Sequence, residues 1–216
     1  MMEENPLPST TFFHLKQEKK EKIDAVLLEE FFSKHISQVK VSAIVEKSHI
    51  SRGAFYKYFQ NLEDAYDYAI TNYSNQIHSA IFTFINRNKN DFFKGIEEYL
   101  AWCSQWSPED DHWKMIHLCT QSNAWTKRDA IPDDSPMIRQ WLELLEENRF
   151  TIHDTQEAVS FLYFIMAVVM DSLTDFISNE WTAKELIKDF RYKVQWIKYG
   201  IKKDNKEYNK EYNKEE

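Results

Sequence analysis

The stretch KVSAIVEKSHISRGAFYKYF, residues 40–59, predicts a short helix, a tight turn and a second short helix. Val41, Ile44 and Val45 place apolar side chains at positions i, i+3 and i+4, which lie on one face of a helix. Ser51 is a suitable first cap for the second helix, because its hydroxyl can accept a hydrogen bond from a backbone N–H of the first turn. The spacing therefore predicts a helix-turn-helix.

The second short helix has an outward face whose chemistry suits a nucleic acid. Phe55 and Phe59, four residues apart, are expected to pack back onto the first helix. The residues that remain outward are Arg52, Gly53, Ala54, Tyr56, Lys57 and Tyr58. One guanidinium, one ammonium, two phenols and two small residues match a major groove lined by phosphates and thymine methyl groups. This face predicts contact with duplex DNA.

The same residues resemble a known family. Residues 21–70 resemble the N-terminal DNA-binding domain of the tetracycline-repressor (TetR) family of bacterial transcription regulators, and SRGAFYKYF, residues 51–59, fits its pattern without a gap. The family commonly has Gly where this chain has His49, and often Lys where it has Leu62. The resemblance implies a dimer, an operator, and an effector site in a C-terminal all-helical domain.

We expect the DNA contacts to come from both short helices. Arg52 is the best candidate for a base edge, since it can bond guanine with two N–H groups, and Lys57 and Tyr58 are expected to hold phosphates. The chain has a net charge of −8, yet residues 40–58 contain four basic residues and only one acidic residue. The positive field is therefore local. The complete set expected to contact DNA is Lys40, Ser42, Ser51, Arg52, Gly53, Ala54, Tyr56, Lys57 and Tyr58.

Composition predicts an all-α fold. The 216 residues include only 3 Gly and 5 Pro, and no alternating strand pattern occurs. The predicted organisation has an N-terminal three-helix helix-turn-helix domain and a larger C-terminal helical domain for ligand binding and dimerisation. In residue numbers, we expect a mobile or lightly docked arm at 1–13, the DNA-binding domain at 14–61, the effector and dimerisation domain at 62–203, and a disordered charged tail at 204–216. Helices are expected at 15–34, 62–86, 91–106, 109–128, 136–149, 154–178 and 182–203, besides the two short ones.

Cysteine content and hydropathy predict a cytoplasmic protein. Cys103 and Cys119 are the only cysteines, and without a secretory signal they are expected to be reduced and buried. The longest apolar run, Phe161 to Met170, is ten residues long, which is too short to span a bilayer. We therefore expect no membrane association.

The last two predicted helices carry long apolar stripes that fit half of a four-helix bundle completed by a second subunit. The alternative is that both stripes face the protomer's own core. The helix at 154–178 favours the dimer, because Phe161, Phe164 and Val168 make it apolar on a further face. On this basis the dimer interface is expected to contain Leu162, Ile165, Val169, Phe190, Val194 and Ile197. Asp171 and Asp175 on the same helix can face solvent, pair across the dimer or point into a pocket.

Tryptophans are concentrated in the middle of the chain, where five of the seven lie between residues 102 and 141. An aromatic-lined cavity would take an apolar or flat effector, a cationic one included. Ordinary core packing is the alternative explanation for each tryptophan. The expected lining residues are Trp102, Trp106, Trp113, His117 and Tyr163.

No pattern in the sequence indicates catalysis, a cofactor or a metal site. No nucleophile elbow, glycine-rich phosphate loop or CxxC occurs, and His112 and His117 are five residues apart, which is not the i, i+4 spacing of paired ligands. The predicted function is a DNA-binding transcription regulator and not an enzyme. It is expected to be a repressor that a small molecule releases from an inverted-repeat operator, bound as a homodimer. The alternative is a regulator whose C-terminal domain responds to a protein partner.

Overall fold

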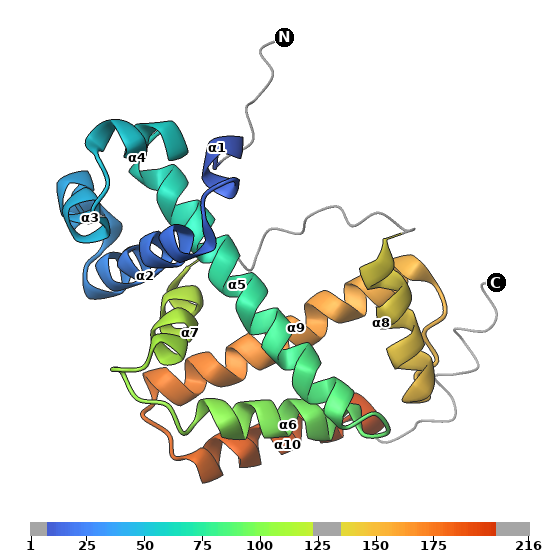
Figure 1. Ribbon diagram of the computed structural model, residues 1–216. Coiled ribbons are helices and arrows are strands. Elements are labelled where there is room, and N and C mark those ends of the chain that lie inside the picture. The colour runs from blue at the N-terminus through green and yellow to red at the C-terminus, as the bar shows by residue number, and fades with distance from the viewer. Residues whose placement is uncertain (1–7, 123–134, 202–216) are drawn as a thin grey trace, which may run out of the picture.

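The computed structural model describes residues 8–122 and 135–201, and its regular elements are all helical, which confirms the predicted fold class. Figure 1 shows a small N-terminal lobe joined to a larger helical lobe by one long helix. The elements are α1 Thr10–Phe13, α2 Gln17–Ser33, the short 3-10 turn η1 Ile36–Gln38, α3 Val41–Ser48, α4 Arg52–Tyr58, α5 Leu62–Arg87, α6 Phe92–Cys103, α7 Asp111–Gln121, α8 Pro136–Glu147, α9 Thr155–Ser178 and α10 Ala183–Tyr199.

Helix boundaries in the N-terminal lobe follow the capping residues. The Ser51 hydroxyl accepts a hydrogen bond from the Ala54 N–H at 3.0 Å, which begins α4 as predicted. The Asn61 side chain accepts one from the Asp64 N–H at 2.8 Å and begins α5. Each cap satisfies a backbone donor that has no partner inside its helix.

Residues 8–13, part of the segment predicted to be a mobile or lightly docked arm, are docked on the N-terminal lobe, and Thr10–Phe13 form α1. The Phe12 ring is fully buried and lies 5.1 Å from the Phe59 ring and 5.0 Å from the Tyr68 ring, measured between ring centroids. A four-residue helix has too few backbone hydrogen bonds to be stable alone, so this anchor holds it. Sequence periodicity cannot reveal such a helix. Residues 1–7, the rest of the expected arm, lie outside the described part.

α2 is tied to α5 by a buried polar network. The Tyr68 hydroxyl donates to Asp24 Oδ1 at 2.8 Å, and the Tyr73 hydroxyl donates to the Asp24 backbone carbonyl at 2.9 Å. Lys20 pairs with the same carboxylate at 2.8 Å. Burial and the Asp24 charge raise the pKa of both phenols, so they remain donors at any physiological pH.

α6 packs against the end of α5 unusually closely. A Cβ atom on Gly95 would lie 2.6 Å from the Cα atom of Ile85 and 2.9 Å from the carbonyl oxygen of Phe84. Both are backbone atoms, which cannot rotate away as a side chain can. Only glycine permits this approach of the two helices.

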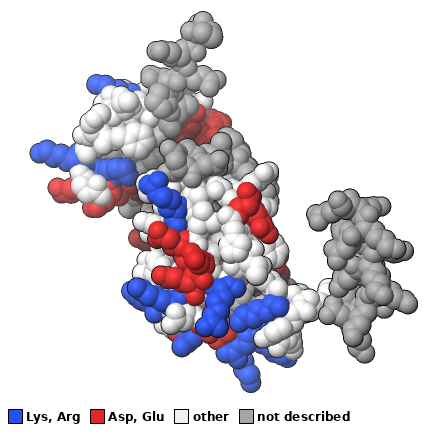
Figure 2. Space-filling view, turned by 90° about the vertical axis from the view of Figure 1, so that its right-hand side faces the viewer, with Lys and Arg blue, Asp and Glu red and all other residues white. Residues whose placement is uncertain are grey.

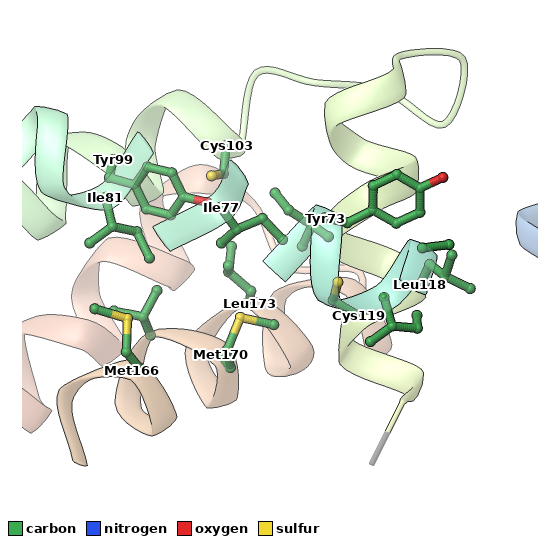
Figure 3. Packing of buried hydrophobic residues seen from close by; sticks show 14 of the residues in the cluster. Tyr73, Ile77, Ile81, Tyr99, Cys103, Leu118, Cys119, Met166, Met170 and Leu173 are labelled. Atoms are coloured by element: carbon green, nitrogen blue, oxygen red, sulfur yellow. The ribbon is translucent and has the colours of Figure 1, made fainter. Parts of the chain in front are cut away.

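The core of the larger lobe lies between α5, α6, α7 and α9, as Figure 3 shows. Ile77, Ile81 and Leu173 are at most 1% exposed, and Met166 and Met170 fill the space beside them. Cys103 and Cys119 are buried thiols, as predicted. Burial raises the pKa of each thiol to about 12, so neither forms a thiolate near neutral pH.

Two helices differ from their expected lengths. α6 ends at Cys103, earlier than the predicted residue 106, and the predicted extension of the next helix to residue 128 lies partly outside the described residues. α9 is one continuous helix of 24 residues, close to the predicted range 154–178. By length and composition alone α9 can cross a bilayer. Here it packs against α6, α7, α8 and α10, as the core helix of a helical domain does.

Candidate DNA-binding surface and effector domain

The turn between α3 and α4 is closed by a residue in the left-handed conformation. His49 has φ 54° and ψ 42°. The Ile50 N–H donates to the Val45 carbonyl at 3.0 Å, and the His49 N–H donates to the Glu46 carbonyl at 3.2 Å, which ends α3 in the manner usually provided by glycine. Histidine can adopt this conformation at a cost that glycine avoids. The turn keeps its shape despite the absence of glycine.

α4 presents an exposed polar face. Arg52, Gly53 and Lys57 are exposed, and Tyr56 keeps 47% of its surface exposed. The Arg52 guanidinium carbon lies 5.8 Å from the centroid of the Tyr56 ring, a cation–π distance that holds the two side chains together. Nothing lies closer than 3.9 Å to the position of a Gly53 Cβ atom, so the face is flat at that point. A guanidinium beside a flat backbone can approach base edges.

Two of the predicted contact residues do not belong to this face. Tyr58 is only 5% exposed, and its ring lies 5.7 Å from that of Phe12. It is on the side of α4 that α1 covers, so its assignment as a phosphate contact is wrong. Ala54 is half-buried, whereas Lys40 and Ser42 at the start of α3 are exposed. The Ser51 hydroxyl is already used as the α4 cap.

A buried carboxylate fixes α3 to α2. Glu30 is fully buried, and its Oε1 lies 2.6 Å from the Lys47 ammonium on α3, while Oε2 lies 3.2 Å from that of Lys34. Burial acts to raise the pKa of Glu30, but the hydrogen bonds from Lys47 and Lys34 outweigh it, so the pKa lies below its ordinary value. Glu30 is therefore charged at neutral pH. The ion pair of Glu30 with Lys47 holds α3, the first helix of the motif, in place against α2.

Charge on the molecule is not separated into one basic and one acidic side. Figure 2 shows basic side chains projecting from the edge of the upper lobe, which contains α1 to α4, with acidic side chains close to them, and both signs interspersed over the rest of that face. A chain with net charge −8 can thus keep a small positive surface at one end.

α2 also contacts the larger lobe, through α7. The Lys114 ammonium lies 3.1 Å from Glu29 Oε2, and its side chain is only 16% exposed. The Phe32 ring lies 5.9 Å from Trp113 and 5.4 Å from His117, which stack on each other at 4.8 Å. The hydrogen bond with Glu29 raises the pKa of Lys114. This junction connects the two lobes at a second place besides α5.

A separate aromatic cluster lies where α6 ends and α7 begins. The His112 ring lies 4.3 Å from Trp102 and 6.1 Å from Trp106. Burial lowers the pKa of His112 to about 4, so it is neutral at physiological pH. The Trp106 indole N–H is buried and has no acceptor among the described residues. A buried donor without an acceptor is costly and marks a place where a ligand acceptor would be stabilised.

The structure therefore divides the predicted effector residues. Trp102 and Trp106 lie together, but Trp113 and His117 belong to the junction with α2. Tyr163 lies on α9 and is half-buried. Of the surface hollows described, one of about 330 Å³ lies beside α1 and α5 and one of about 390 Å³ lies along α10, and the predicted residues line neither. Sequence spacing could not separate these groups because α6 and α7 meet at an angle that it does not encode.

Four residues of the predicted dimer interface are buried inside the protomer. Leu162, Ile165, Val169 and Phe190 are at most 7% exposed. Their stripes are where α9 and α10 pack against each other and against α6 and α8, so their assignment to the dimer interface is wrong. Val194 and Ile197 are half-buried and pack against the same core.

A different stripe of α9 and α10 is exposed and apolar. Phe164 is 46% exposed, Tyr192 46% and Trp196 53%. Lys193 on α10 lies 2.7 Å from Asp171 and 3.7 Å from Asp175, so both acids have a partner within the protomer. We name this surface the α9–α10 stripe; its residues are the exposed Phe164, Ala167, Asp171, Tyr192 and Trp196, with the half-buried Val168. Phe164 and Val168 indicate this face in the sequence, whereas the predicted interface residues lie on the more regular stripe.

Comparison with known proteins agrees with this architecture. A family model described as the tetracyclin repressor-like C-terminal domain matches residues 91–201, more than half of the chain. A search of curated proteins finds no match.

Solved structures with a similar arrangement include three regulators. A putative TetR-family regulator from Syntrophomonas wolfei is 17% identical, with 88% of this chain and 99% of that chain covered at a TM-score of 0.49. A TetR-family regulator from Chloroflexus aurantiacus is 20% identical, with 88% and 90% covered at a TM-score of 0.45. The fatty acid degradation regulator FadR from Bacillus halodurans is 17% identical, with 82% and 94% covered at a TM-score of 0.44. The family-model match carries the assignment: the chain belongs to the TetR family of transcription regulators.

Proposed function

We propose that this protein is a repressor that binds an inverted-repeat operator as a homodimer and leaves it when a small molecule binds the larger lobe. TetR-family regulators bind DNA and typically act as dimers. The observation that carries the DNA assignment is the exposed face of α4, where Arg52 and Tyr56 lie together beside Gly53. With Tyr58, Ala54 and the capping residue Ser51 removed from the set, the proposed contacts are Arg52, Gly53, Tyr56 and Lys57 on α4, with Lys40 and Ser42 at the start of α3.

The α9–α10 stripe is the proposed dimer interface. Its aromatic residues are exposed in the protomer, and α9 has an apolar side beyond the one that its own lobe covers. Two copies would bury these residues in a four-helix arrangement. This interface would place two α4 helices about one DNA turn, roughly 34–36 Å, apart.

Replacing Arg52 by Ala should relax base preference at one position in each half-site and weaken operator binding by about 1–3 kcal/mol. Lys57→Ala should weaken binding to all sequences alike and reduce the slope of log affinity against log salt by about 1 for each protomer, or about 2 for the homodimer. A gel-shift series with single-base operator variants measures both effects. The Tyr58→Phe variant is the matched control, because this buried ring should leave DNA affinity unchanged. If Arg52→Ala retains full base preference, α4 does not read the operator through this residue.

The proposed effector site is the cluster of Trp102, Trp106 and His112. The three rings are neutral at physiological pH, and the Trp106 N–H needs an acceptor. These features favour an apolar or aromatic neutral ligand that carries a carbonyl or similar acceptor. α7 begins at this cluster and reaches α2 through Lys114, so a ligand here would act on the element that contacts the DNA-binding lobe. Trp113 and His117 would transmit the change and would not line the site.

A ligand of this kind should change the tryptophan emission of the protein at the concentrations that release it from DNA. The factor by which the ligand weakens operator binding should equal the factor by which the operator weakens ligand binding. In a typical coupling this factor corresponds to about 1–3 kcal/mol. Titrations of wild type and Trp106→Phe, with and without operator, measure both. The variant should lose affinity for the ligand but keep its affinity for DNA. A compound that releases the operator with unaltered emission would place the site elsewhere.

A second candidate function is a response to a protein partner. The observation that favours it is the filled interior between α5, α6 and α9, where Met166 and Met170 occupy the space beside Ile77 and Ile81. A partner would then act on the surface of the larger lobe. We place it second because the dimer accounts for the exposed aromatic residues of the α9–α10 stripe.

A further inference from the structure

The start of α5, which follows α4 directly, has no positive charge to offer to DNA. Leu62 is half-buried, and Glu63 is exposed. The Asp64 carboxylate accepts a hydrogen bond from the Gln60 N–H at 2.9 Å. A phosphate near the end of α4 would therefore meet two carboxylates on α5. Binding there needs positive charge from another element.

α1 and the start of α2 are the elements fixed to that end of α4. The Ser9 hydroxyl donates to the Lys57 carbonyl at 2.7 Å, and the Ser9 N–H donates to the Tyr58 carbonyl at 3.0 Å. These bonds satisfy two of the carbonyl groups that a helix end leaves open. In Figure 1 α3 lies on one side of α4, and α1 lies on the other with the start of α2. The recognition helix is thus flanked by two segments that are rigidly attached to it.

The start of α2 carries lysines with different surroundings. The Lys20 ammonium is held inside the lobe by Asp24 and by the rings of Phe12 and Tyr68. Lys16 and Lys19 are exposed, and among the described residues no carboxylate pairs with either. The Lys19 ammonium lies 5.9 Å from the centroid of the Tyr58 ring, which places it over the last turn of α4. Lys19 is therefore positioned beside the recognition helix, and Lys16, the N-cap residue of α2, precedes it by three residues.

We propose that Lys16 and Lys19 bind DNA backbone phosphates at the edge of the major groove, on the side of α4 away from α3. Phosphate ridges border the groove on both sides, and Lys40 with Ser42 can serve only the α3 side. Tyr58, which sequence analysis assigned to a phosphate, instead supports Lys19 through its ring. The inference rests on the proposed operator binding and adds a second backbone contact to it.

The test is the salt dependence of DNA affinity for the Lys16→Gln, Lys19→Gln double variant. Each lost phosphate contact should reduce the slope of log affinity against log salt by about 0.9, so the double variant should lose up to about 1.8 for each protomer, or about 3.6 for the homodimer on its operator. Operator and unrelated DNA should weaken by the same factor, because phosphates carry no sequence information. Lys19→Arg should retain the wild-type slope. Lys94→Gln, which removes a lysine of α6 in the larger lobe, is the matched control and should change nothing.

The outcomes separate this inference from the proposed function. Wild-type protein that shows no preference for any operator would overturn the proposed function itself. If wild type binds its operator and the double variant binds it with the same affinity and salt slope, the operator assignment stands and the lysine contacts are refuted. A loss confined to the operator would also refute them, since it would indicate base reading. An unchanged melting temperature of the double variant excludes misfolding as the cause.

Discussion

Replacing Gly95 by Ala is expected to lower the free energy of unfolding by about 3 kcal/mol, near the upper end of the usual cost of overpacking. The added methyl group would meet the Ile85 Cα at 2.6 Å and the Phe84 carbonyl oxygen at 2.9 Å. Real Cβ contacts of that length do not occur, so α6 must move away from α5. Such a shift would open the contacts of Tyr99 and Leu100, which are fully buried on the same helix. Denaturant unfolding followed by circular dichroism measures the change.

Gly53→Ala is the matched control, because it adds the same methyl group to a helix with open space. Nothing lies nearer than 3.9 Å to its Cβ position, and alanine favours a helix over glycine by about 1 kcal/mol. We therefore expect Gly53→Ala to be as stable as wild type or more so, but to bind DNA less tightly, since the methyl group would stand between α4 and the groove. Equal stability of wild type and Gly95→Ala would mean that the two helices can separate at no cost, contrary to the packing described.

Placing a charge on the α9–α10 stripe is expected to convert the dimer to monomers. A carboxylate in Phe164→Asp or Trp196→Asp would be buried without a partner between two subunits, which strongly opposes association. Operator affinity should fall by about a hundredfold or more, because two linked half-site contacts become one. Sedimentation should then report the 26.0 kDa protomer in place of twice that mass.

Two control variants test whether the loss of dimers is specific to the α9–α10 stripe. Phe13→Asp changes an aromatic residue that is 55% exposed on α1, far along the chain from the stripe, and should leave the protein dimeric. Val169→Asp places the charge at a fully buried position of the same helix and should unfold the protein, as its burial inside the protomer requires. Dimers that persist in both stripe variants would show that subunits associate through another surface.

The DNA-binding motif could be predicted from sequence because its signals are local. Ser51 and Asn61 cap their helices by bonds to residues three positions away, and Ile44 and Phe55 are buried as their spacing implied. Tyr58 was misplaced because a seven-residue helix has almost no face that a neighbour cannot reach, and that neighbour, α1, has no periodic pattern of its own. Helical spacing shows that a residue is on a stripe but does not show which element covers it.

The same limit explains the larger lobe. The stripe of Leu162, Ile165 and Val169 was correctly recognised as apolar, and so was the further face that contains Phe164. Which of the two faces is covered within the protomer depends on the side of α9 against which α8 and α10 pack. The loops that connect the helices set this placement, and the periodicity of apolar residues does not predict the direction of a loop. The tryptophans were divided for a similar reason, since α6 and α7 are separate helices joined by residues 104–110.

The position of α2 gives it a mechanical role in the molecule. Near its end, Glu29 and Phe32 touch α7, while its beginning carries Lys16 about 20 Å away at 1.5 Å of helix rise per residue. The Asp24 network with Tyr68 and Tyr73 lies between them and would act as the pivot. Lys16 is about 12 Å from Asp24 along the helix, so a tilt of about 5° about this pivot would move it by about 1 Å. In the proposed homodimer the same tilt would occur in both subunits, so both DNA-binding lobes would shift against the operator.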